Sequence, residues 1–568
     1  MVDPTIYYVA LVLALATASF FHHPHSSSHG GRNDVDRSDG TDVRPRQPLL
    51  SAKAWFLTEH ELTQSRGGIP RDNMQVYTTG NNVTALTVSR DFFNAVYDDL
   101  CATKAGDRVL LSAWLAALVP LKPDVDPSGN TTGVLKVFTD LVHRGTNVNV
   151  LAWANIDFGY TPYILHARDA INAIAPSRRH GAKAVFLFDD RLPSMTSHHQ
   201  KFLVLGADTS THATAQPVAY VGGIDLAMDR WDTITHNALA IRDAGHITFH
   251  NQGWIDGHVR IHGPAAKDVA QSFLERWNSR TVPSQGLHEE LLDFTNPPYA
   301  PLRPLSYASS NRTGVHGTHS VQIVRTFSCL YDGYEFAPRG ETSLFAARVK
   351  AIKNARNFIY IEDQYFILVP ELLAALLDVL PHLQRVVVLV NAHTSPFANV
   401  GYIKYFYDNV APLRARFPRK FQIYTVKPAR HVLVHTKLVI IDDVYVSIGS
   451  ANWNRRSMTS DTELNADIVD TDTIASPDGV VVGKLPRHVR LRKFQEWTGL
   501  RYDELEAMTF VEAADHLREA VHDNASLLAN HTIEEKAYFF AITESVRKIA
   551  DPQDTCDDDG RKRDKDTA

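Results

Sequence analysis

Residues 435–450 read HTKLVIIDDVYVSIGS, and this stretch decides how the chain folds. A histidine and a lysine two residues apart stand before the apolar run 438–441, and a second apolar run, 444–448, ends at the small pair Gly449 and Ser450. Short runs rich in Val and Ile are typical of buried strands. We therefore expect two adjacent strands, with the histidine and the lysine at the head of the first.

A second copy of this pattern lies earlier in the chain. Residues 199–205 read HQKFLVL, and residues 220–223, YVGG, close the next apolar run. In an extended strand, residues i and i+2 point to the same face, so the histidine and the lysine of each copy project together. One such pair means little, but two pairs with matching turns indicate duplicated lobes packed about a pseudo-twofold axis. The side chains brought together are His199, Lys201, His435 and Lys437.

These four side chains suit the chemistry of phosphate esters. Two lysines can neutralise the non-bridging oxygens of a phosphate and stabilise the charge of its transition state. Imidazoles titrate near neutral pH, so one can attack phosphorus while the other protonates the departing alkoxide. The turns of small residues let the backbone, together with the side chains of Ser450 and Asn452, approach the same phosphate.

Strands alternate with helices on both sides of the two motifs. In the first half we expect strands at 108–114, 148–152, 184–188, 202–205 and 218–221, and helices at 133–143 and 264–277. In the second half we expect strands at 358–361, 386–390, 422–426, 438–441 and 444–448, and helices at 343–353, 370–380 and 402–417. This alternation predicts an α/β fold of two pseudo-symmetric α/β/α sandwich lobes that share one active site.

The boundaries follow from composition. The first lobe is expected at 51–285, a loop rich in Pro, Ser and Asn at 286–320, the second lobe at 321–500, two further helices within 501–550 and a charged tail at 551–568. The helices within 501–550 are expected at 502–520 and 533–549. With 568 residues, 44% of them hydrophobic and 21% charged, the chain has the composition of a globular protein. Its net charge of −6 gives no broad attraction to nucleic acid.

The amino terminus indicates a secretory route. Residues 5–21 are apolar, and Ala16-Thr-Ala18 has the small-x-small pattern of a cleavage site, so residues 1–18 are expected to be a signal peptide. Asp3 and the lack of Lys or Arg before the run leave an uncleaved anchor open, with a lumenal or extracellular body. Residues 19–50 are expected to be a disordered linker. Sequons for glycosylation stand at Asn82, Asn130, Asn311, Asn524 and Asn530.

Three cysteines exclude a disulfide-rich scaffold and a cysteine-based zinc cluster. A bridge between Cys101 and Cys329 is possible, which would leave Cys556 free in its polar tail. Asp256 and His258 can be interpreted as a metal pair, but a structural role at the edge of a strand is favoured, and no metal site is expected.

These motifs resemble those of the phospholipase D superfamily. Residues 435–442 with 449–457 look like its second H-x-K-x-x-x-x-D motif, and 197–201 with 221–232 look like the first. Residues 258–278 and 360–366 resemble segments of its phosphatidylcholine-type branch, in a secreted form without amino-terminal lipid-binding modules.

The resemblance implies the following roles. His199 would be the nucleophile that forms a phosphohistidine, and His435 the general acid and base. Asp232 and Glu463 would orient the histidine of the opposite lobe, and Asp442 would support its own motif. The phosphate would be held by Lys201, Lys437, Ser450, Asn452, Gly223 and Asp225. Glu362 and Gln364 can line the pocket, whereas Trp231 and Trp453 either contact lipid or pack beside the site.

One position departs from the family pattern. The residue seven after His199 should be Asp but is Gly206, with Asp208 two residues further on. Either Asp208 replaces the missing carboxylate, or that support is lost. Because the reacting groups remain, activity is still expected.

The resemblance implies hydrolysis of a glycerophospholipid such as phosphatidylcholine to phosphatidic acid and a free alcohol, with transphosphatidylation as a related outcome. The expected partner is phospholipid at a membrane surface, with no cofactor, no nucleic acid and no obligate protein partner. Two rivals stay open: a secretory-route nuclease of the same superfamily, and a non-catalytic protein that binds a phosphate head group.

Overall fold

One sheet of 15 strands runs through both halves of the chain. The computed structural model describes residues 43–155, 159–193, 196–208, 217–250, 252–283, 293–306, 317–331, 333–392, 402–533 and 556. The expected signal segment, the helix at 533–549 and most of the charged tail lie outside these residues. Among the described residues, no helix combines the length and apolar character needed to cross a membrane.

The first half supplies seven strands of this sheet. Their order is β1-β8-β6-β5-β2-β3-β4, with β2, β3 and β4 parallel to one another. The strands are β1 (Thr78–Leu86), β2 (Asp107–Ala113), β3 (Asn147–Trp153), β4 (Ala184–Asp189), β5 (Phe202–Ala207), β6 (Val218–Gly222) and β8 (His258–His262).

The second half repeats this order as β9-β16-β15-β14-β10-β11-β12, with β19 (Leu528–Asn530) added at the edge. The strands are β9 (His319–Thr326), β10 (Phe358–Glu362), β11 (Arg385–Leu389), β12 (Phe421–Val426), β14 (Leu438–Ile441), β15 (Tyr445–Gly449) and β16 (Glu463–Asp470). The matching orders confirm the two pseudo-symmetric lobes. Antiparallel pairing of β1 with β9 joins the two expected sheets into one.

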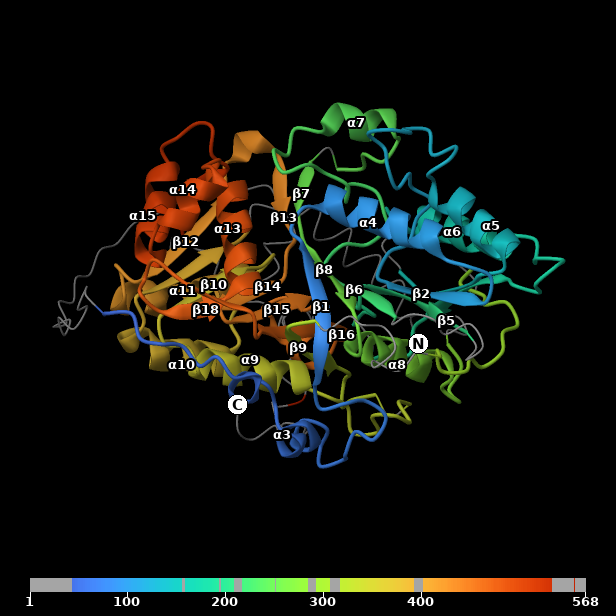
Figure 1. The fold of residues 1–568 in the computed structure, drawn as a ribbon, viewed down its shortest axis with the longest axis horizontal. Coiled ribbons are helices and arrows are strands. Elements are labelled where there is room, and N and C mark those ends of the chain that lie inside the picture. The colour runs from blue at the N-terminus through green and yellow to red at the C-terminus, as the bar shows by residue number, and fades with distance from the viewer. Residues whose placement is uncertain are drawn as a thin grey trace, which may run out of the picture.

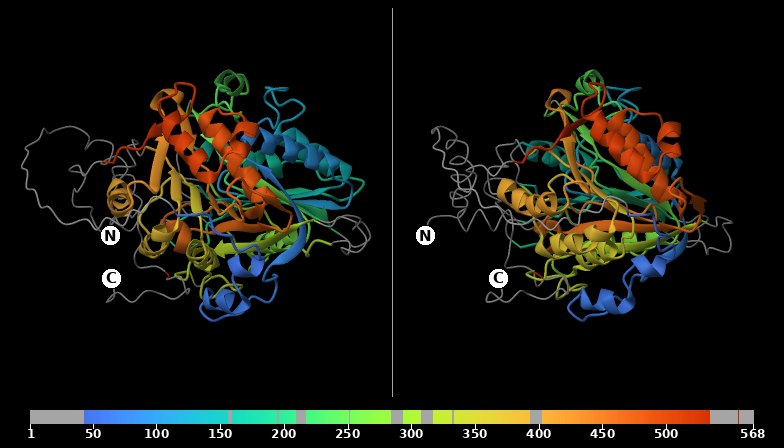
Figure 2. Two further views of the ribbon diagram at one scale, coloured as in Figure 1. Left: turned by 60° about the vertical axis from the view of Figure 1, so that its left-hand side comes forward. Right: turned by 90° about the vertical axis from the view of Figure 1, so that its left-hand side faces the viewer.

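Helices cover both faces of the sheet in each lobe, as Figure 1 and Figure 2 show. In the first lobe these are α4 (Ser89–Ala102), α5 (Val134–Arg144) and α6 (Thr161–Asn172) on one face and α8 (Ala265–Trp277) on the other. In the second lobe they are α9 (Ser343–Lys353), α10 (Pro370–Val379) and α11 (Tyr402–Arg416) on one face and α13 (Lys484–Thr498), α14 (Tyr502–Ala507) and α15 (Phe510–Ala520) on the other. Shorter helices are α2 (Ala52–Trp55), α3 (Glu59–Gln64), α7 (Leu239–Ala244) and α12 (Arg455–Thr459).

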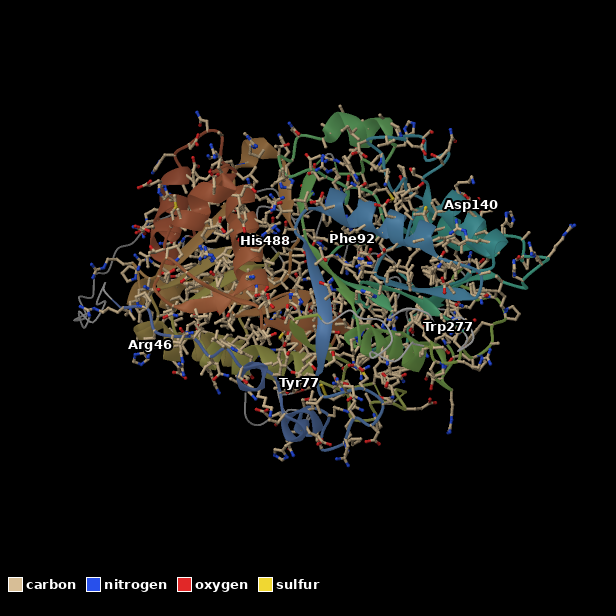
Figure 3. All side chains as sticks on the ribbon, in the orientation of Figure 1. Arg46, Tyr77, Phe92, Asp140, Trp277 and His488 are labelled. Atoms are coloured by element: carbon tan, nitrogen blue, oxygen red, sulfur yellow. A yellow bond between two sulfur atoms is a disulfide. The ribbon has the colours of Figure 1, made fainter. Side chains whose placement is uncertain are left out.

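The helices form where apolar residues recur at helical spacing. In α4, Phe92, Phe93, Val96 and Leu100 are all buried against the sheet. Figure 3 shows Phe92 inside the first lobe, where it is buried. It shows Asp140 of α5 at the edge of this lobe, where the side chain is half exposed. One cluster of buried side chains extends from α8 to α13 across both lobes, so the lobes share a core.

Three expectations need correction. The helix expected at 502–520 is two helices, because Thr509 begins a new one with a capping box to Glu512. Residues 43–50, assigned to the linker, lie against the second lobe, where the Arg46 amide donates to Asn357 Oδ1 at 2.7 Å. Cys329 pairs with Cys556, not with Cys101, which is exposed and free.

Candidate active site

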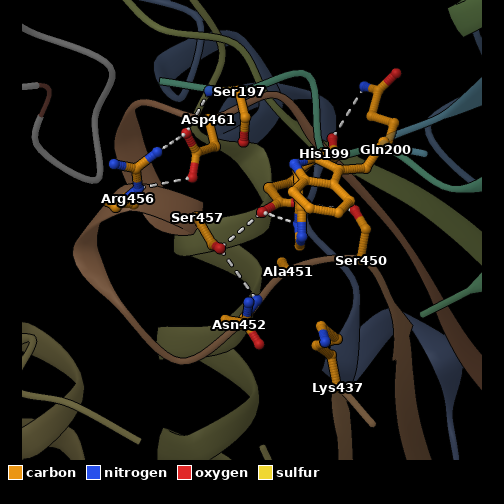
Figure 4. Close-up of polar contacts among 12 residues, drawn as sticks. Ser197, His199, Gln200, Lys437, Ser450, Ala451, Asn452, Arg456, Ser457 and Asp461 are labelled. Carbon is orange, nitrogen blue, oxygen red and sulfur yellow. Dashed lines mark hydrogen bonds and ion pairs between the residues drawn. The ribbon is translucent and has the colours of Figure 1, made fainter. Parts of the chain in front are cut away.

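His199 lies where the lobes meet, just before β5. Its backbone amide donates to the carbonyl oxygen of Thr462 at 2.9 Å, so the strand head is fixed to the other lobe. Its ring nitrogen Nδ1 lies 2.9 Å from Oε1 and 3.1 Å from Oε2 of Glu463, the first residue of β16. Figure 4 shows His199 beside Ser450 and Ser457, with Lys437 below them. Glu463 therefore occupies the orienting position that the sequence predicted for it.

His435 repeats this arrangement from the second lobe. It follows β13 (Val432–Val434), which pairs in parallel with β7 (Gly253–Ile255) of the first lobe. Its amide donates to the Ile255 carbonyl oxygen at 2.8 Å, and its Nδ1 lies 2.6 Å from Oδ2 of Asp256. Each histidine thus binds a carboxylate of the opposite lobe through Nδ1. Nε2 is the nitrogen left for substrate.

The carboxylate that orients His435 is Asp256, so the assignment of this role to Asp232 is wrong. Asp232 is buried elsewhere, 3.0 Å from His236 Nδ1 and 2.9 Å from Arg242 Nη1. The missed signal was positional. Glu463 begins the third strand of its antiparallel run, and Asp256 stands just before β8, the matching strand. Comparison of the two halves strand by strand would have found it.

The two lysines are buried beside the histidines. Lys201 Nζ donates to the His199 carbonyl oxygen at 2.8 Å and lies 3.8 Å from Asp225 Oδ2. Lys437 Nζ donates to the His435 carbonyl oxygen and lies 3.4 Å from Gln364 Oε1. Gln364 therefore belongs to the site.

The turn after β15 surrounds Glu463. Both Ser450 and Ser457 donate their hydroxyl groups to this carboxylate, Ser457 at 2.7 Å. The backbone amide of Asn452 donates to Ser457 Oγ at 3.1 Å. The side-chain Oδ1 of Asn452 is buried without a partner among the described residues. This oxygen only accepts and cannot bind a phosphate oxygen, so the predicted phosphate contact of Asn452 requires its Nδ2 group as the donor. The Ser450 hydroxyl is engaged with Glu463.

The turn after β6 differs from the prediction. A Cβ atom at Gly223 would lie 2.2 Å from Asp256 Oδ1, so this glycine makes room for the carboxylate. Asp225 accepts from the amides of Trp114 and Leu115 at 3.0 and 3.3 Å and faces Lys201. A carboxylate in this position supports the lysine and would repel a phosphate. The assignment of Asp225 as a phosphate ligand is therefore corrected.

Asp442 has the supporting geometry that was expected. Its carboxylate accepts from the amides of Arg356, Asn357 and Phe358 at 2.7 to 2.8 Å. In the part of the first lobe that the structure describes, no carboxylate bond of this kind is found at Gly206. Asp208 instead pairs with Arg108 and accepts from Asn147 Nδ2 at 3.0 Å, so it supports the strand through side chains.

Other candidates are structural. Glu362 accepts from Trp497 Nε1 at 2.8 Å and pairs with Lys493, away from the histidines. The ring of His258 packs against that of Phe92, tilted by 35° with the centroids 4.2 Å apart, and its Nδ1 accepts from the Ile224 backbone amide at 3.3 Å. Trp231 and Trp453 are fully buried and pack. Among the described residues, no three His, Cys, Asp or Glu side chains are placed to hold a metal ion.

The electrostatics of the site follow from burial. Burial, reinforced by Lys201 and Lys437, holds the pKa of His199 well below its usual range, and burial with Lys437 does the same for His435. Burial raises the pKa of Asp256 and of Glu463 to about 7 and lowers that of Lys437 to about 7. Both imidazoles are therefore neutral near pH 7. The carboxyl group of each imidazole–carboxyl pair gains or loses its proton near the same pH.

Two sequence families match the chain, one on each motif. A family described as "Phospholipase D" matches residues 125–371, and one described as "Cardiolipin synthase, PLD-like domain" matches residues 349–477. Among solved structures, the phosphatidylserine synthase of Haemophilus influenzae Rd KW20 aligns with 77% of this chain and 92% of its own, at 14% identity and a TM-score of 0.45.

Curated relatives include phospholipases D of plants. Phospholipase D gamma 2 of Arabidopsis thaliana is 29% identical over 43% of this chain and 33% of its own length. Phospholipase D gamma 3 of the same plant is 32% identical over 33% of this chain and 26% of its own length. Phospholipase D alpha 1 of Zea mays is 26% identical over 52% of this chain and 48% of its own length. The matches thus span between a quarter and a half of these relatives. The two family models and the plant relatives support the phospholipase D superfamily as the group to which both lobes of this chain are related.

Proposed function

We propose that this chain is a phospholipase-D-type phosphodiesterase that cleaves glycerophospholipids, such as phosphatidylcholine, through a phosphohistidine. The observation that carries the proposal is the mirrored pair of histidines. Each is held through Nδ1 by a carboxylate of the opposite lobe, and two buried lysines lie beside them. This arrangement leaves two Nε2 atoms and two cations for one phosphodiester.

The reaction then has two steps. The lone pair of His199 Nε2 forms a bond to phosphorus while the bond from phosphorus to the head-group oxygen breaks, and His435 Nε2 gives its proton to that oxygen. His435 next takes a proton from water, the water oxygen attacks phosphorus, and the P–N bond breaks to release phosphatidic acid. Lys201, Lys437 and the Asn452 side chain would hold the non-bridging oxygens throughout. Another alcohol in place of water gives transphosphatidylation.

The test is release of choline and phosphatidic acid from phosphatidylcholine vesicles by the full chain. We expect His199→Ala and His435→Ala each to lower the rate about 10³-fold or more, because each removes a reacting group. His522→Ala, at an exposed histidine of the second lobe, is the control and should keep the parental rate. Vesicle cleavage that survives both active-site substitutions would refute the mechanism.

A nuclease of the same chemistry is the second candidate, and one observation favours it. Trp114 stacks on Trp153 with ring centroids 5.8 Å apart, and its ring lies 6.4 Å from that of His199. Stacked, half-exposed aromatic rings beside a phosphodiester site can also bind bases. Cleavage of single-stranded nucleic acid, with vesicles left intact, would select this candidate.

We also propose that the chain enters the secretory route. The apolar segment 5–21 and the disulfide between Cys329 and Cys556 support this, since disulfides form in oxidising compartments. Recovery of the expressed chain from the medium or from a membrane fraction, with or without residues 1–18, would separate secretion from anchoring.

A further inference from the structure

Arg230 is a buried cation between β6 and β7 that the proposed mechanism does not use. Its side chain is 2% exposed, and its guanidinium carbon lies 3.5 Å from the ring centroid of Trp254. The same carbon lies 6.0 Å from the ring centroid of Tyr160. Arg230 is thus held between two aromatic rings in the first lobe.

These two rings connect Arg230 to His435 and His199 through ring contacts. The Trp254 ring lies 4.7 Å from the His435 ring. The Tyr160 ring lies 5.9 Å from Trp114, whose ring lies 6.4 Å from that of His199. Arg230 therefore lies near His435, with the Trp254 ring between them, and is connected to His199 through Tyr160 and Trp114.

Among the described residues, no carboxylate forms an ion pair with the guanidinium of Arg230, although its charge acts against the burial that raises the pKa of Asp256. Nη1 donates to the Met228 carbonyl oxygen at 3.3 Å, and Nε is buried without a partner. By contrast, the buried Arg242 and Arg276 lie 2.9 and 3.2 Å from carboxylate oxygens. A buried cation that no carboxylate pairs directly is unfavourable, so its surroundings favour the binding of an anion.

The anion that fits is the phosphoryl group. The planar fork of an arginine matches two oxygens of a phosphate, which an ammonium group cannot do. The charge of Arg230 also reaches both motifs, since it contributes to lowering the pKa of His435 and of Lys201. Lys201 and Lys437 approach the same place from the strand heads.

We propose that Arg230 is a third cationic ligand of the phosphoryl group, which binds a non-bridging oxygen together with Lys201 and Lys437. This inference rests on the proposed function for the position of the phosphate. The ligand is a phosphodiester group, whether it comes from a lipid or from another diester. Its charge is largest in the transition state, where the guanidinium contributes most.

The first experiment measures binding of tungstate, a tetrahedral oxyanion, to the full chain by calorimetry. We expect Arg230→Gln to raise the dissociation constant about tenfold or more, and Arg230→Lys to raise it less, because the lysine keeps the charge but loses the fork. Arg487→Gln is the control. Arg487 is also buried, at 4% exposed against 2% for Arg230, and Asp443, which lies 3.8 Å from Arg487, stays paired with Arg490 in this variant. Unchanged binding in both folded Arg230 variants would overturn the proposal.

The second experiment compares two diesters, phosphatidylcholine vesicles and soluble bis(4-nitrophenyl) phosphate. If Arg230 binds the phosphoryl group, we expect Arg230→Gln to lower kcat/KM for both diesters by a similar factor. A loss on vesicles alone would place Arg230 at the lipid head group and refute the proposal.

The two experiments separate failure of the inference from failure of the function. If the parent cleaves neither diester while tungstate binding still depends on Arg230, the anion site stands and the proposed function fails. If the parent cleaves both and Arg230→Gln changes neither cleavage nor tungstate binding, the function stands and the inference fails.

Discussion

Two aspartates in the first lobe show how position, more than residue type, decides what a buried carboxylate does. Asp232 and Asp256 are both fully buried, and each binds the Nδ1 atom of a histidine. Asp256 reaches His435 at the interface of the lobes, whereas Asp232 reaches His236 four residues away. Only the first of these contacts can orient a reacting imidazole.

Substitution of each aspartate separates the two roles. We expect Asp256→Asn to lower kcat about 10²-fold or more, because His435 loses the group that fixes its ring and its tautomer. We expect Asp232→Asn to leave kcat per folded molecule near the parental value and to destabilise the fold by about 3 kcal/mol, since Arg242 is left unpaired. Vesicle cleavage and thermal unfolding of both variants check this. The reverse pattern would restore the original assignment to Asp232.

The pH dependence of activity follows from the same carboxyls. Glu463 must be ionised to accept from His199, so activity rises as pH passes about 7, the raised pKa of Glu463. The Asp256–His435 pair must hold a proton for the leaving group, so activity falls above about 7, the raised pKa of Asp256. We expect a narrow bell-shaped profile of kcat/KM, and loss of its acidic limb in Glu463→Gln. An unchanged acidic limb in that variant would contradict the assignment.

The sequence was sufficient to predict which histidines and lysines of the two motifs come together, but not all of their partners. A repeated spacing of histidine and lysine, two residues apart, identifies four of the side chains: His199, Lys201, His435 and Lys437. Asp256 stands 57 positions after His199 in the sequence and contacts a residue 179 positions away, so no local pattern connects them. The burial of Asp256 between the lobes depends on the whole fold. Only the matching strand order of the two lobes identifies Asp256 as the counterpart of Glu463.

At the scale of elements, each active-site half is an antiparallel run of three strands, β5-β6-β8 and β14-β15-β16. In both, the second strand ends at a glycine, and the third carries the carboxylate at or just before its start. The residue after the glycine faces that carboxylate. In the second lobe it is Ser450, which donates to Glu463, whereas in the first lobe it is Gly223, which leaves room for Asp256.

A methyl group at Gly223 should therefore disturb catalysis. Its Cβ would lie 2.2 Å from Asp256 Oδ1, so we expect Gly223→Ala to displace the carboxylate and to lower kcat about 10²-fold. Gly257→Ala is the control beside the same carboxylate, because its Cβ would have only an ordinary contact, 3.5 Å from the Leu86 carbonyl oxygen. If Gly223→Ala keeps the parental kcat on vesicles, the turn accepts the methyl group without displacing Asp256, and the prediction is wrong.

At the scale of the whole molecule, the sequence predicts two lobes but not the strands that join them. The central pair, β1 and β9, mixes apolar residues with Thr, Asn, Gln and Arg, so neither segment has the apolar run that marked the other strands. Every residue of β9 is buried because both lobes cover it, whereas in β1 Thr79, Asn82 and Thr84 are exposed. Gln322, for example, binds the backbone oxygens of Leu57 and Val76. Pairing across 240 residues is set by the docking of two folded lobes.

A buried histidine also ties the lobes together. His236 of the first lobe lies 3.0 Å from Asp232 and 3.1 Å from Glu496 of α13 in the second. Burial opposes the charge of the ring, but the hydrogen bonds with Asp232 and Glu496 outweigh it and raise the pKa of His236 to about 9. Because the folded state binds this proton more tightly than the unfolded chain, with its pKa near 6.5, the stabilisation is complete below about pH 6.5 and is lost as pH rises through about 9.

His236→Gln should therefore destabilise the protein in a pH-dependent way. We expect a loss of about 3 kcal/mol at pH 6, which shrinks at pH 10 because the parental His236 is then neutral as well. Denaturant unfolding of parent and variant at both pH values measures this difference. His522→Gln, at an exposed histidine, should show no such change. A difference of the same size at pH 6 and pH 10 would mean that His236 joins the lobes by packing and not by its charge.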